Sequence, residues 1–90
     1  MVSSKRKGTN FENYVKRKLL ELGYVVFRCA ASKPIDLIAV KDGSVVLVEC
    51  KAFENPPKSS WSKLLELAQR CGAKALKVYK KRGKVVLEWV

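Results

Sequence analysis

Two acidic residues and a lysine flank a short hairpin signal in this 90-residue chain, and their spacing favours metal chemistry. The pair Asp42-Gly43 predicts a two-residue turn between antiparallel strands. Counting back from that turn places Asp36 directly opposite Glu49, and facing residues on one side of a hairpin have Cβ atoms about 4.5 to 5.5 Å apart. Lys51 projects from the same face as Glu49 because side chains alternate along a strand. All three side chains are therefore expected at one end of a sheet.

Two carboxylates at that distance repel each other unless a cation or a proton lies between them. We predict a metal site, because apolar neighbours make an isolated charge there cost several kcal/mol. Carboxylate oxygens and the backbone carbonyl of Cys50 suit Mg²⁺, with Mn²⁺ as a substitute. Such an ion would support phosphodiester hydrolysis, with Lys51 orienting water or stabilising charge. The alternative is an ordinary salt-bridge cluster in which Asp36 and Glu49 point outward and pair with Lys33 and Lys51.

The composition favours a polyanionic partner. Lysine and arginine outnumber aspartate and glutamate 19 to 8, which gives a net charge of +11. Basic residues spread along a chain neutralise DNA phosphates and release counterions, although a solubilising surface is a plainer explanation. The absence of histidine excludes an imidazole base and histidine-ligated metal sites. The widely spaced Cys29, Cys50 and Cys71 indicate neither a disulfide framework nor a zinc finger, and we expect them to be reduced and buried.

The length fits one domain with a modest core. We expect residues 1–9 to form a basic N-terminal arm that contacts DNA through Lys5, Arg6 and Lys7, and residues 10–90 to form a single domain. No apolar run approaches the ~20 residues of a bilayer span, and no signal peptide is visible. We therefore expect an intracellular, cytoplasmic protein with no membrane partner and no small-molecule cofactor, from either a cellular or a viral source.

Hydrophobic periodicity predicts a first helix over residues 10–22, capped by Thr9 and ended by Gly23. Glu12 lies beside the apolar stripe of this helix, where it could turn toward the sheet. It could equally cap Thr9 in a T-x-x-E capping box, and the residues alone leave both interpretations open. The apolar stripe consists of Phe11, Val15, Leu19 and Leu22.

The remaining elements follow from β-rich runs and turn signals. A second helix is predicted where apolar residues recur before Gly72, with Leu64, Leu65, Ala68 and Cys71 on its inner side. The order of elements is αβββαββ. Strands are predicted over residues 24–30, 35–41, 45–53, 75–80 and 84–90, and the second helix over 61–71.

The run Pro34-x-Asp36, followed after one hairpin by Glu49-Cys50-Lys51, resembles the motif of the PD-(D/E)XK nuclease superfamily. The longer segments 6–12, 23–36 and 48–51 are similar to the archaeal Holliday junction resolvases. This resemblance implies a restriction-endonuclease-like α/β fold with a central mixed five-stranded sheet flanked by two helices.

The resemblance also implies roles for individual residues. Ser32 matches an active-site serine of the family, and the helix-one glutamate of the family's metal site corresponds to Glu12. Family members are homodimers that cut two opposed strands of a four-way DNA junction, with Leu67 and Cys71 at interface or core positions. The implied metal ligands are Glu12, Asp36, Glu49 and the Cys50 carbonyl, and the implied DNA contacts are Arg28 and Lys33.

Three functions remain open at this point. The first is a structure-selective endonuclease that resolves four-way junctions, and the second is another PD-(D/E)XK endonuclease of restriction or repair type. The third is a non-catalytic DNA-binding protein, against which the intact Asp36, Glu49 and Lys51 argue. A junction resolvase needs a dimer, for which the apolar Trp61, Trp89 and Val90 are surface candidates.

Overall fold

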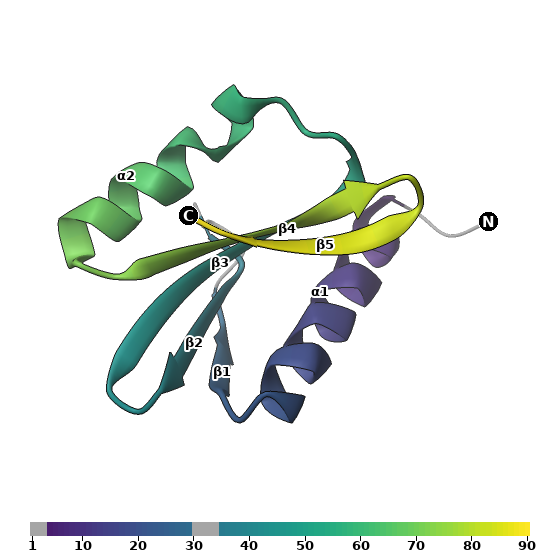
Figure 1. Ribbon diagram of the computed structural model, residues 1–90. Helices are drawn as coiled ribbons and strands as arrows, with labels where there is room; N and C mark the ends of the chain where they lie inside the picture. The colour runs from purple at the N-terminus through teal and green to yellow at the C-terminus, as the bar shows by residue number, and fades with distance from the viewer. Residues whose placement is uncertain (1–3, 30–34) are drawn as a thin grey trace.

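The computed structural model describes residues 4–29 and 35–90, with side chains from residue 10 onward. Five strands form one sheet in the order β1-β2-β3-β4-β5, with α1 against one face and α2 against the other (Figure 1). The β3–β4 pair is parallel and the other pairs are antiparallel, so the predicted mixed sheet with two flanking helices is confirmed. The elements are α1 (Ser4–Glu21), β1 (Val25–Arg28), β2 (Leu37–Lys41), β3 (Ser44–Glu54), the 3-10 helix η1 (Lys58–Trp61), α2 (Ser62–Cys71), β4 (Lys74–Lys81) and β5 (Lys84–Trp89).

Helix α1 begins at Ser4, earlier than the sequence predicted. The backbone of Lys5, Arg6 and Lys7 is helical rather than part of a separate arm, because lysine and arginine are good helix formers and continue the helix past the cap signal. Thr9 therefore lies inside the helix, and the capping box with Glu12 is wrong. Helix α1 ends at Glu21, so Leu22 follows it and is 55% exposed instead of joining the core.

The β2–β3 hairpin turns where it was predicted. Asp42 and Gly43 both have positive φ, 51° and 78°, and Lys41 faces Ser44. Positive φ at both central residues gives the turn a twist that matches paired strands. The predicted register then holds from Lys41 back to the pair Leu37–Val48.

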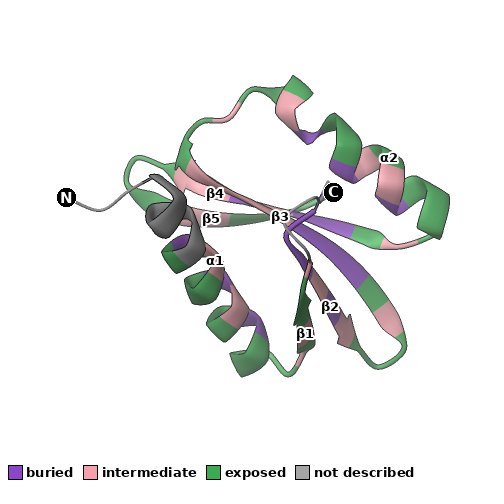
Figure 2. Ribbon diagram, turned by 180° about the vertical axis from the view of Figure 1, so that it is seen from behind, coloured by how far each residue is buried: buried purple, intermediate pink, exposed green. Residues whose placement is uncertain are grey.

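Each face of the sheet has its own apolar cluster, and buried residues concentrate on the central strands and the inner sides of the helices (Figure 2). On the α1 face, Phe11, Val15 and Leu19 pack on β2, β3 and β4. The other cluster includes Trp61, which is 2% exposed. The prediction of Trp61 as a surface residue was wrong, because η1 turns its ring inward against the sheet. The α2-face cluster consists of Ile35, Leu47, Trp61, Leu64, Ala68 and Ala75.

The connection from β3 to β4 passes through α2, which ends at Gly72 in the left-handed conformation (φ 64°). The predicted strands and second helix match the observed ones to within a few residues. Cys71 is exposed, contrary to expectation, since it lies in the last turn of α2, whereas Cys29 and Cys50 are partly buried. None of the described helices is both long and apolar enough to span a membrane.

Candidate active site

Backbone hydrogen bonds on both sides fix Asp36, which is 6% exposed. Its carbonyl accepts the N–H of Cys29 at 2.9 Å, and its own N–H donates to the carbonyl of Val48 at 3.0 Å. The ladder pairs Val48 with Leu37, so two successive residues of one strand face one residue of β3. This is the arrangement of a β-bulge, which redirects side chains at the end of a strand.

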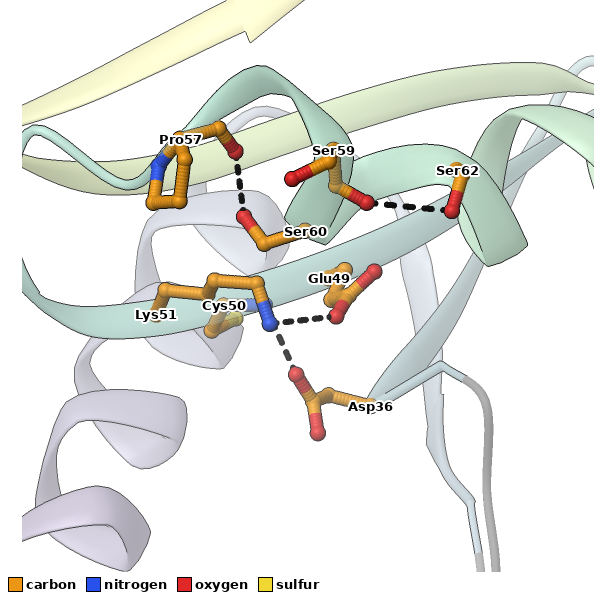
Figure 3. Close-up of polar contacts among 8 residues, drawn as sticks. All are labelled: Asp36, Glu49, Cys50, Lys51, Pro57, Ser59, Ser60 and Ser62. Atoms are coloured by element: carbon orange, nitrogen blue, oxygen red, sulfur yellow. Dashed lines mark hydrogen bonds and ion pairs between the residues drawn. The ribbon is translucent and has the colours of Figure 1, made fainter.

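The bulge corrects the predicted pairing of Asp36 with Glu49. The regular ladder stops at Leu37–Val48, and the Asp36 carboxylate accepts the backbone N–H of Cys50 at 2.7 Å (Figure 3). The same irregularity places Ile35 in the cluster on the α2 face, whereas strict alternation with Leu37 would put it on the α1 face. Asp36 still lies beside β3, joined to the residue between Glu49 and Lys51.

Glu49 and Lys51 form a close ion pair on β3. The Glu49 Oε2 atom lies 2.8 Å from the Lys51 Nζ atom, and the two side chains are 12% and 20% exposed respectively. The other oxygen, Glu49 Oε1, is buried and has no hydrogen-bond partner among the described residues. A buried carboxylate oxygen without a donor is unfavourable unless something else satisfies it. Glu49 therefore has one oxygen committed to lysine and one available to a cation.

The backbone changes register immediately after this pair. The β3–β4 ladder pairs Cys50 with Val78 and next pairs Glu54 with Lys80, so β3 spends two more residues than β4 over this interval. Bulges of this kind occur often beside active sites because they change the direction of a side chain. Lys51 lies at the start of the irregular stretch.

Trp61 lies beneath the lysine. The Lys51 Nζ atom is 5.4 Å from the centre of the Trp61 ring, and the Nζ atom of Lys77 on β4 is 5.7 Å from the same centre. Both distances are within the range of cation–π attraction. The sequence predictions missed both neighbours: Trp61 follows a loop, and Lys77 carried no motif, although Lys77, Tyr79 and Lys81 alternate along β4 and so share one face.

Glu12 approaches the same end of the sheet from α1. Its Oε1 atom lies 3.5 Å from Nη2 of Arg28, the last residue of β1, and its side chain is 18% exposed. Arg28 pairs with Leu37, the residue after Asp36. The structure thus brings a helix-one carboxylate and a predicted DNA-contacting arginine together. The roles of both residues remain predictions.

Several predicted residues lie outside the part of the chain where side chains are described. Ser32, Lys33 and Pro34 fall in the segment 30–34, and Lys5, Arg6 and Lys7 are described in their backbone alone. Within the described part, no three acidic, cysteine or histidine side chains form a group that could hold a metal ion. Asp36 and Glu49 supply the one or two carboxylates through which proteins usually bind Mg²⁺.

A mixed five-stranded sheet that carries an aspartate before one strand and a Glu-x-Lys pair on the next has the architecture of a PD-(D/E)XK domain. A model of the archaeal Holliday junction resolvase (Hjc) family matches residues 3–90. The chain belongs to this family.

Named relatives and a solved structure agree with this assignment. The chain is 35% identical over 85 residues to the crossover junction endodeoxyribonuclease Hjc of Methanocaldococcus jannaschii, a match that covers 90% of this chain and 64% of that protein. It is 32% identical over 83 residues to the Hjc of Sulfurisphaera tokodaii, covering 80% and 58% respectively. The chain thus spans less than two thirds of the length of these relatives. Archaeoglobus fulgidus Hjc, described as a Holliday junction resolvase, has the same fold, with a TM-score of 0.70 and 22% identity over 90% of this chain and 70% of that chain.

Proposed function

We propose that this chain is a Mg²⁺-dependent endonuclease that resolves four-way DNA junctions. The observation that carries the proposal is the convergence of Asp36, Glu49 and Lys51 at one end of the sheet, with the buried Glu49 Oε1 atom lacking a donor among the described residues. Membership of the Hjc family and relatives named crossover junction endodeoxyribonuclease support the choice of substrate. The net charge of +11 supports a polyanionic substrate.

The oxygen donors at this site fit a hard divalent cation. We infer that Asp36 and Glu49 hold Mg²⁺, with the Cys50 carbonyl and Glu12 as further candidate ligands and Mn²⁺ as a substitute. Bound there, the ion would supply Lewis acidity for hydrolysis of a phosphodiester. Mg²⁺ commonly keeps several waters and binds substrate phosphates, so two protein carboxylates suffice.

The chain's own residues would position the substrate. Lys51 presents a cation beside the carboxylates, held by Glu49 and by the Trp61 ring, where it can bind a phosphate oxygen and stabilise the charge that develops during hydrolysis. The Cys50 N–H fixes one oxygen of Asp36 and so orients its carboxylate. Cys50 packs its side chain against the α1-face cluster, which anchors this part of β3.

Asp36→Asn tests the assigned site. The amide oxygen of asparagine can still accept the Cys50 N–H, so the fold is expected to survive while the negative charge is lost. We expect Mg²⁺-dependent cleavage of a synthetic four-way junction to fall by about 10²- to 10³-fold or more, with junction binding retained. Asp42→Asn is the matched control, because it removes the same charge in a turn where Asn-Gly is also favoured. Full cleavage by Asp36→Asn would refute the site.

The substrate assignment is tested separately with wild-type protein. A four-way junction and a linear duplex of the same arm sequence are compared in Mg²⁺, and paired nicks in the junction are expected. Equal cutting of both substrates would refute the assignment as a junction resolvase and would favour a PD-(D/E)XK endonuclease of another type. Binding without cutting of either substrate would favour a non-catalytic DNA-binding protein.

We also propose that the active form is a homodimer. Two symmetric cuts need two sites and each chain supplies one, so an isologous pair is required. An apolar strip on the α2 face of the β1–β2–β3 region supports a partner there: Val25, Phe27 and Val45 are 57%, 55% and 41% exposed. Phe27 faces Ile38, and both Ile38 and Leu67 of α2 pack against the α2-face cluster, so the apolar surface continues from the strip toward α2.

A further inference from the structure

A basic pocket adjoins the candidate active site on the α2 face of the sheet. It encloses about 210 Å³ between the segment that precedes α2 and the strands β4 and β5. Three of its lining residues are lysines and one is acidic. The charged and aromatic lining residues are Lys58, Trp61, Lys77, Tyr79, Lys81 and Glu88.

The charge of this pocket favours an anion. Its one carboxylate, Glu88, accepts a hydrogen bond from the Tyr79 hydroxyl at 2.6 Å, an interaction that orients both side chains. Lys77, Tyr79 and Lys81 occupy every second position of β4, so their side chains lie on one face of the sheet. Three ammonium groups against one carboxylate leave the lining with a net positive charge.

The pocket and the candidate active site share a wall. The buried Trp61 ring lies under both Lys51 and Lys77, and it contacts Tyr79 with ring centres 5.9 Å apart. Lys77 also pairs with Glu49 in the parallel ladder, which places the two residues side by side on neighbouring strands. A phosphate bound at Lys51 would therefore have its neighbours in the same strand close to Lys77, because phosphates recur about every 3.4 Å along the axis of each strand.

We propose that this pocket binds a backbone phosphate of the cut DNA strand, next to the phosphate that is hydrolysed, through Lys77 and Lys81. The inference rests on the proposed nuclease function and adds a second phosphate subsite to it. Lys77 then sets the position of the strand relative to Lys51. Trp61 is a positioning residue, because its ring holds Lys51 and Lys77 on one surface.

Lys77→Met tests the subsite, because methionine keeps an aliphatic stem over the Trp61 ring and removes the charge. The control is Lys74→Met on the same strand, which loses the same charge. Lys74 pairs with Val46, a residue of the α1-face cluster, so it lies on the opposite face. Both substitutions are made in Asp36→Asn, in which cutting is expected to be strongly reduced, and binding of a four-way junction is measured over a range of salt concentrations. Loss of a phosphate contact is expected to lower the salt slope by about one in Lys77→Met, and Lys74→Met is expected to leave it unchanged.

A chemical probe locates the contact. Single neutral methylphosphonate linkages are placed on either side of the cleavage position in the junction. At one of these positions, the neutral linkage should weaken junction binding by the Asp36→Asn protein. The same linkage should not weaken binding by the protein that carries both Asp36→Asn and Lys77→Met. If Lys77→Met and Lys74→Met behave alike while the parent protein binds the junction, the subsite is refuted and the nuclease proposal stands. If the parent protein binds no DNA, both proposals fail.

Discussion

The two faces of the sheet differ in how completely they are covered. On the α1 face, residues from the helix and from β2, β3 and β4 form a cluster whose members are nearly all fully buried, with Leu19, Leu37 and Leu76 at 0% exposure. On the α2 face, the shorter helix packs on β3 and β4 and leaves Val25 and Phe27 of β1 exposed. One face is closed, and the other is partly open.

This difference separates stability from function. The α1 face buries apolar surface and anchors Cys50, the residue between Glu49 and Lys51. The α2 face carries the buried Glu49 oxygen that has no hydrogen-bond partner among the described residues, and it carries the exposed apolar strip. Neither feature stabilises the folded monomer. Features that weaken a monomer are concentrated on the face that would meet metal, DNA and a second copy.

The largest effect on stability is expected on the closed face. Leu19→Ala should lower the free energy of unfolding by about 2–5 kcal/mol, because it removes a fully buried side chain and leaves a cavity. The neighbouring Leu20 is 47% exposed on the same helix, and Leu20→Ala should change stability by less than about 1 kcal/mol. Urea unfolding followed by circular dichroism measures both. Equal losses would contradict the assignment of the α1-face core.

Substitutions on the open α2 face are expected to weaken dimer association and to leave the stability of the fold unchanged. Phe27→Ser removes the largest side chain of the exposed strip, so the dissociation constant of the proposed dimer should rise by at least about tenfold. Leu22→Ser is the control, since Leu22 is equally exposed at 55% but follows α1. Sedimentation equilibrium reports the change. A Phe27→Ser protein that dimerises as tightly as Leu22→Ser would place the interface elsewhere.

A smaller effect is expected at the β4–β5 turn, which follows Lys81 of the basic pocket. Arg82 and Gly83 both have positive φ, and their N–H groups donate to the carboxylate of Glu54 at 2.7 and 3.0 Å. Glu54→Ala removes both acceptors at an exposed site, so stability should fall by about 1 kcal/mol. Glu66→Ala, on the exposed side of α2, should have no measurable effect. Thermal unfolding of the two variants makes the comparison.

The two hairpins also show how far the sequence could be interpreted. The residue pair Asp42-Gly43 favours a two-residue turn by itself, so the register of β2 and β3 could be counted from it. In contrast, Arg82 is an unusual residue for positive φ and depends on Glu54, 28 residues earlier in the chain. Such a long-range contact leaves no local pattern, although the strands on either side of it were predicted correctly.

The part of the candidate site that depends on local pattern was predictable, and the part that depends on long-range contacts was not. Alternation along β3 fixes Glu49 and Lys51 on one face from sequence alone. The bulge at Asp36 was not predictable, because it depends on which N–H the Val48 carbonyl accepts after the regular ladder has ended. Trp61 and Lys77 reach Lys51 through the packing of η1 and the parallel pairing of β4, neither of which the motif contains.

The smallest expected effect concerns the ionisation of Tyr79 on the open face. Its hydrogen bond to Glu88 raises the pKa of the phenol above the ordinary value of 10.0, because the bond requires the protonated hydroxyl and the carboxylate disfavours a second negative charge. The stabilisation from this bond is therefore present below pH 10 and is lost as the pH rises through the raised value. Absorbance of tyrosinate should show one tyrosine titrating late, identified by its loss in Tyr79→Phe. Glu88→Ala should return that titration to lower pH, whereas Glu66→Ala should not. If Glu88→Ala leaves the curve unchanged, the hydrogen bond does not control this tyrosine, and the orientation of the pocket wall has another cause.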